Sequence, residues 1–157
     1  MRRTVLIAIA AVAAIAAVPV TAAVPVQTAS PVKAHVSPGT GGPHTTFTVS
    51  FRNPAQIGQL GSTVRANTVY VQGTNRPGCV WSGQIAAPTA AAKQMIRVAL
   101  TASHMSGAGA GAWCAGLFHG TIVQSQHFTC APPHLCPMIA IRPQTIAHFS
   151  FRVKRRA

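Results

Sequence analysis

The chain has 157 residues, of which 13 are Lys or Arg and none is Asp or Glu, so its formal net charge at pH 7 is +13. Ordinary amino-acid usage would place ~19 acidic residues in a chain of this length. Without a side-chain carboxylate, the chain cannot by itself supply the paired acids of a glycosidase, a Ser-His-Asp triad or the oxygen cage of a Ca²⁺ site.

Residues 1–23 have the three parts of a secretory signal peptide. Arg2 and Arg3 carry the positive charge, residues 5–18 form an unbroken apolar run, and Pro19 ends that run. Small residues follow, and we predict cleavage at the end of this segment. The apolar run is shorter than the ~20 residues of a transmembrane helix, so we expect a secreted protein with no stable membrane span after cleavage. The twin-arginine route stays open beside the general secretory route.

The mature chain is long enough for one domain. Cleavage would leave about 134 residues, which is an ordinary domain length. Residues 24–32, rich in Pro, Thr and Ala, are predicted to be a linker, and residues 33–157 the folded domain. Since it is exported and strongly basic, we expect it to meet an anionic cell-wall polymer or an acidic protein.

Most of the positive charges are scattered along the sequence, but four of them are nearly contiguous at its end. We predict that these four contact a polyanion, and they are Arg152, Lys154, Arg155 and Arg156. The alternative is that the charge only keeps a small domain soluble.

Short strands dominate the pattern of the mature chain. In the clearest one, Phe47, Val49 and Phe51 alternate with polar residues, which is typical of a strand with one buried face. No segment after the signal peptide has a convincing helical period. The predicted strands are 33–37, 45–52, 63–72, 94–100, 113–123, 138–142 and 145–153, with turns at 37–43 and 106–111 and irregular structure over 73–92.

About seven short strands with turn residues between them predict an all-β protein, an immunoglobulin-like antiparallel β-sandwich. A small β-barrel is the alternative.

Six short segments support this expectation: VSPG (36–39), GGP (41–43), TFTVSF (46–51), GCV (78–80), WCAG (113–116) and CP (136–137). Together they resemble segments of small secreted immunoglobulin-like β-sandwich proteins of high-GC Gram-positive bacteria. The resemblance implies a fold and an export route, and it implies no activity.

Four cysteines, Cys79, Cys114, Cys130 and Cys136, suggest two disulfides in an exported chain, with three possible pairings. Cys130 and Cys136 flank a short proline-containing loop and can close locally, which would leave Cys79 to pair with Cys114. Trp113 stands beside Cys114, and a Trp near an intersheet disulfide suits an immunoglobulin-like core.

A metal site is the alternative use of the same region. His127, Cys130, His134 and Cys136 place four nitrogen or sulfur ligands within ten residues. An oxidising compartment favours disulfides over free thiols, so we predict no metal and no cofactor.

The sequence favours a non-enzymatic binding or structural module. It has no Gly-x-Ser-x-Gly turn and no Gly-rich phosphate loop. Specific nucleic-acid binding is not expected, because Tyr70 and most other aromatic residues fall at core-like positions. A secreted serine-protease inhibitor is the alternative function, since Cys136-Pro137-Met138 resembles the segment before the reactive bond of subtilisin-inhibitor-like proteins.

Overall fold

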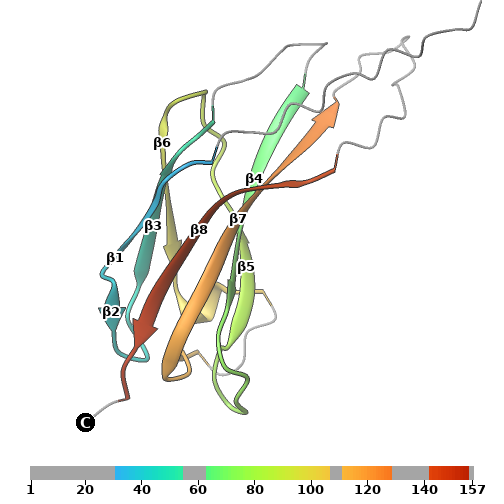
Figure 1. Cartoon of the computed structure of the whole chain (residues 1–157). Helices are drawn as coiled ribbons and strands as arrows, with labels where there is room; N and C mark the ends of the chain where they lie inside the picture. The colour runs from blue at the N-terminus through green and yellow to red at the C-terminus, as the bar shows by residue number, and fades with distance from the viewer. Residues whose placement is uncertain (1–30, 55–62, 107–110, 129–141, 156–157) are drawn as a thin grey trace, which may run out of the picture.

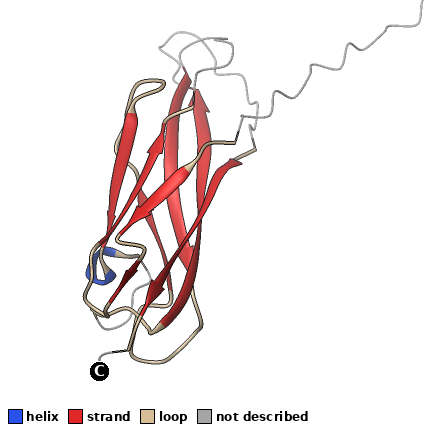
Figure 2. Cartoon of the chain, turned by 60° about the vertical axis from the view of Figure 1, so that its left-hand side comes forward, coloured by secondary structure: helices blue, strands red, loops and turns tan. Residues whose placement is uncertain are grey.

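The computed structural model describes residues 31–54, 63–106, 111–128 and 142–155, and only the backbone of 63, 64, 127 and 128. Strands make up most of this part of the chain, and the one described helix is a single 3-10 turn (Figures 1 and 2). The elements are β1 (Ala34–Ser37), β2 (Thr40–Gly41), β3 (Phe47–Arg52), β4 (Thr63–Gln72), β5 (Ser82–Ala86), β6 (Met95–Leu100), η1 (Ala102–His104), β7 (Gly116–Phe128) and β8 (Gln144–Val153).

The strands form two sheets that pack face to face (Figure 1). One sheet has three strands in the order β1-β3-β6, and the other has five in the order β2-β8-β7-β4-β5. Every pairing is antiparallel except that of the two-residue β2 with β8. In immunoglobulin nomenclature the sheets hold strands A-B-E and G-F-C-C′. The predicted immunoglobulin-like sandwich is confirmed, and the small barrel is wrong because the two sheets do not close on each other.

On the inner faces of both sheets, every second residue of a strand is buried. In β3, Phe47, Val49 and Phe51 are at most 1% exposed, while the residues between them face outward. The buried set of β6 is Ile96, Val98 and Leu100. Successive side chains of a strand point to opposite faces, so this alternation in the sequence is enough to assign the core face.

An aromatic cluster fills the core between the sheets. Trp113 lies edge-on to Phe118 and Phe151, with ring centroids 5.2 and 5.5 Å apart, and the rings of Phe118 and Phe151 stack at 5.0 Å. Phe47, from the opposite sheet, lies 4.3 Å from Phe151. The indole N–H of Trp113 donates a hydrogen bond to the carbonyl oxygen of Thr45 at 3.1 Å. The cluster therefore joins both sheets through large buried rings.

The pairing of β7 with β8 is irregular at one point. Ile122 pairs with Ala147, but Val123 pairs with Thr145, so Ile146 is an extra residue in β8. As a result, Ile146 and Ala147 both point into the core although they are adjacent. In a regular strand two adjacent side chains point to opposite faces, and the bulge is the reason these two share one.

Two strands of the structure were not expected, and one starts later than predicted. β2 lies inside the segment 37–43, which was predicted to be a turn. β5 lies inside 73–92, which was predicted to be irregular because apolar and polar residues do not alternate there. Trp113 was predicted to begin a strand but forms only an isolated bridge with Val80, and β7 begins at Gly116. The predicted strand 138–142 lies outside the described residues except for its last position, which is not in a strand.

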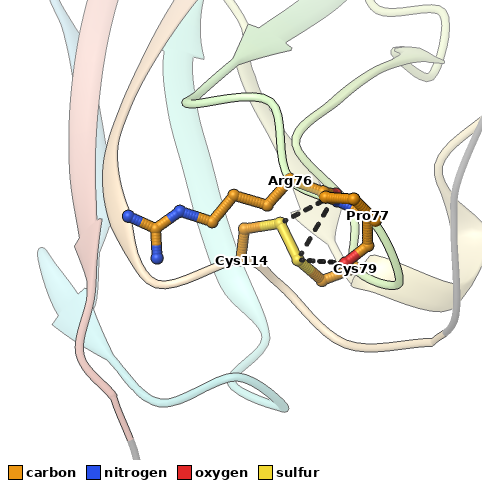
Figure 3. Close-up of a disulfide and its surroundings, with 4 residues drawn as sticks. All are labelled: Arg76, Pro77, Cys79 and Cys114. Carbon is orange, nitrogen blue, oxygen red and sulfur yellow. Dashed lines mark hydrogen bonds between the residues drawn. A yellow bond between two sulfur atoms is a disulfide. The ribbon is translucent and has the colours of Figure 1, made fainter.

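Cys79 and Cys114 form a disulfide, as predicted, with their Cα atoms 5.1 Å apart (Figure 3). The bond does not join the two sheets: it links the β4–β5 connection to the segment before β7, and both lead into the five-stranded sheet. The Arg76 carbonyl oxygen lies 3.8 Å from each sulfur. Because a disulfide sulfur has no hydrogen to donate, these are packing contacts. Cys130 and Cys136 lie outside the described residues, so their pairing stays a prediction.

Three buried side-chain amides form a hydrogen-bonded group at one end of the sandwich. Asn53, Asn67 and Gln124 are at most 8% exposed. Asn67 donates to Asn53 Oδ1 at 3.0 Å, Gln124 donates to Asn67 Oδ1 at 3.1 Å, and Asn53 donates to the carbonyl of Ala90 at 2.7 Å. The amides thus satisfy one another and hold the β5–β6 connection against β3, β4 and β7.

We expect the thermal midpoint to be nearly constant between about pH 3 and pH 5. In most proteins stability falls on acidification because carboxylates whose pKa is lowered by folding must take up protons. This sequence has no Asp or Glu, so in that window only a terminal carboxylate titrates; imidazoles ordinarily titrate nearer pH 6.5. Scanning calorimetry across the window measures the midpoint. A decrease of more than ~5 °C, which is about 1 kcal/mol for a domain of this size, would contradict the expectation.

Candidate functional site

The predicted C-terminal cations lie at the end of β8. Arg152 is exposed on that strand, and Lys154 and Arg155 follow it, also exposed. The backbone here is anchored, because the Arg152 N–H donates to the Gly39 carbonyl at 3.0 Å and the Lys154 N–H donates to the Gly41 carbonyl at 2.8 Å. Arg156 lies outside the described residues.

A second group of cations lies on the other sheet, and the sequence did not predict it. Four exposed side chains gather on or beside the outer face of β1-β3-β6. We call this group the cationic face, and its members are Lys33, Arg52, Lys93 and Arg97.

Strand register brings the members of the cationic face together. Arg97 in β6 lies opposite Ser50 in β3, and Arg52 lies two residues further along β3. Such diagonal neighbours are ~7–8 Å apart, so the two arginines are close without being directly opposed. The β1–β3 pairing starts at Ala34. Carried one residue further back, the same register places Lys33 across from Arg52.

Lys93 is held beside Arg52 by the backbone. It has φ 65, in the left-handed region that side-chain-bearing residues rarely adopt. Its N–H donates to the Asn53 carbonyl at 2.9 Å, and its own carbonyl accepts from Arg52 Nη1 at 3.5 Å. A residue kept in an unfavourable conformation is a reason to ask whether its position is functional.

The candidate metal and inhibitor residues lie largely beyond what the structure describes. Cys130, His134, Cys136 and Met138 are outside the described residues, and only the backbone of His127 is described, in β7. Over the described ranges, no group of three or more His, Cys, Asp or Glu residues is placed to hold a metal ion.

Tyr70 corrects one expectation. The sequence placed the aromatic residues mostly at core-like positions, yet Tyr70 is 40% exposed on the outer face of the five-stranded sheet. Its neighbours in β4, Val69 and Val71, are both buried. The alternation of those valines is the signal that assigns Tyr70 to the outside.

The charged surfaces and the exposed tyrosine are therefore accessible to a partner. No described helix has the length and apolar character to cross a membrane. No protein-family model, no curated protein and no solved structure matches this chain.

Proposed function

We propose that this protein is an exported, non-enzymatic binding module that attaches to an anionic polymer of the extracellular space or cell envelope. The observation that carries the proposal is the cationic face, four exposed positive side chains. Arg52 and Arg97 come from two paired strands, Lys33 directly precedes β1, and Lys93 belongs to the β5–β6 connection. The export half of the proposal rests on the signal-peptide pattern of residues 1–23.

The charge balance of the whole chain supports this function. The sequence has no Asp or Glu, so no neighbouring carboxylate competes with a ligand for these cations. Unopposed charges attract a polyanion over about a Debye length, ~8 Å at physiological ionic strength. Because Arg52 and Arg97 stand on paired strands, their backbone is already fixed and little backbone freedom is lost when they bind.

The test compares two variants that lose the same charge. In the first, Lys33, Arg52, Lys93 and Arg97 are changed to Gln. In the second, the four C-terminal cations Arg152, Lys154, Arg155 and Arg156 are changed to Gln. Each variant has four positive charges fewer than the wild type. Retention on immobilised heparin and on immobilised lipoteichoic acid is measured over a gradient of NaCl.

We expect both variants to elute at lower salt than the wild type and the cationic-face variant to elute earliest, with the weakest dependence of affinity on salt. Equal elution of the two variants would show that net charge alone is responsible and would contradict a site on the three-stranded sheet. Unchanged elution of both would exclude electrostatic binding altogether. Far-UV circular dichroism of each variant checks that the fold is kept.

A further inference from the structure

The outer face of the five-stranded sheet has an open depression of about 600 Å³. It crosses β5, β4, β7 and β8, the four strands that carry Gln84, Tyr70, Thr121 and His148. Strand register places these four residues directly opposite one another in a single row. The volume falls in the range of small-molecule sites, ~300–1,000 Å³, and Tyr70 is near its middle.

Tyr70 gives the depression an exposed aromatic surface. It is one of three large hydrophobic side chains exposed in the described part of the chain, and the others, Met95 and Leu117, do not line the depression. Tyrosine combines a flat apolar ring with a hydroxyl that can donate and accept hydrogen bonds. It can therefore contact the apolar face of a ligand and a polar group at the ligand's edge.

Hydrogen-bonding side chains lie beside the ring. Gln84 lies beside Tyr70 in the first row, and Gln72 and His119 form the next row along the sheet. These three side chains are exposed, and they make no side-chain hydrogen bond within the described residues. Each carboxamide offers two N–H donors and a carbonyl acceptor, so the surface has hydrogen-bonding capacity that the described fold does not use.

The lining carries no permanent positive charge. No Lys or Arg lines the depression, although the chain has 13 of them. Those that are described lie on the cationic face, at the ends of strands and in connections. A site without a Lys or Arg offers no permanent positive charge to a phosphate or carboxylate, so the lining favours a neutral ligand.

We propose that this depression binds a neutral carbohydrate chain, with a sugar ring stacked on Tyr70 and its hydroxyls bonded to Gln72 and Gln84. A pyranose ring has an apolar face of C–H groups and a rim of hydroxyls that donate and accept, which matches an exposed tyrosine between carboxamides. The site is on the sheet opposite the cationic face, so it does not depend on the polyanion proposal.

The single tyrosine of the sequence provides a direct measurement. Protein with ¹³C-labelled tyrosine is titrated with chitohexaose, cellohexaose and a mannohexaose up to about 10 mM, some ten times the dissociation constant of a weak 1 mM ligand. We expect at least one of the three to shift the Tyr70 ring resonances saturably. A heparin hexasaccharide is the charged comparison. Shifts with heparin alone, or with none of the four, would overturn the proposal.

Variants test the contact itself, by calorimetry with the oligosaccharide that shifts Tyr70. Tyr70→Ala is expected to weaken binding at least roughly tenfold, Gln84→Ala roughly threefold, and Tyr70→Phe less than either. The cationic-face variant is expected to bind like the wild type. Wild-type affinity in Tyr70→Ala would contradict the assignment, whereas a loss confined to the cationic-face variant would move the site to the other sheet.

Discussion

Replacing both Cys79 and Cys114 by Ala is expected to lower the free energy of unfolding by about 4 kcal/mol. The bond closes a loop of 35 residues between two connections that lead into the five-stranded sheet. In the chain-entropy model a cross-link of this length restricts the unfolded chain by that amount. Small domains have total stabilities of only ~5–15 kcal/mol, so the variant should be close to unfolded at physiological temperature. Urea unfolding followed by far-UV circular dichroism measures the change.

The control for the disulfide is a second double variant, Cys130→Ala with Cys136→Ala. Its cysteines are only six positions apart in the sequence. If they are bonded to each other, the same model gives a contribution of about 2 kcal/mol. A loss below ~1 kcal/mol in the Cys79 and Cys114 variant, or a larger loss in the control, would show that the long-range bond does not dominate the stability.

Much of the fold could be predicted because its strands carry local signals. β3 and β6 have strict alternation of apolar and polar residues, and the predicted bounds differ from the observed ones by at most two residues. β5 has no such signal, because Ser82, Gly83 and Gln84 give no apolar alternation. It is a strand only because β4 pairs with it at the sheet edge. That pairing cannot be predicted from the local sequence.

The candidate sites were predicted less well, because strand pairing over long sequence distances brings most of their residues together. The C-terminal cations are nearly contiguous in the sequence, so the sequence alone reveals the group. Arg52 and Arg97 are far apart in the sequence and become neighbours only through the β3–β6 register. Alternation shows that each side chain points outward but not which strand lies beside it. The row that joins Gln84 to Tyr70 likewise depends on long-range pairing.

If both proposals hold, the two surfaces allow the chain to bind two kinds of polymer at once. The cationic face lies on one sheet and the depression around Tyr70 on the other, so a ligand on one does not cover the other. The core between them is the shared scaffold, and damage to it should disturb both surfaces together.

Trp113→Ala is expected to cost about 3–5 kcal/mol of unfolding free energy. Trp113 is 2% exposed and contacts the rings of Phe47, Phe118 and Phe151. Its removal leaves a cavity where the two sheets meet and also deprives the Thr45 carbonyl of its indole donor. Circular dichroism in urea is the measurement, because the substitution itself changes the fluorescence.

Two further substitutions serve as comparisons: one separates ring packing from the hydrogen bond, and the other is a surface control. Trp113→Phe keeps an aromatic ring but loses the N–H that donates to Thr45, so we expect it to destabilise less than Trp113→Ala but by at least ~1 kcal/mol. Met95→Ala removes a side chain that is 51% exposed and should cost under about 0.5 kcal/mol. If Trp113→Ala cost no more than Met95→Ala, the aromatic cluster would not be what holds the sheets together. If Trp113→Phe matched Trp113→Ala, the single hydrogen bond would outweigh the buried ring.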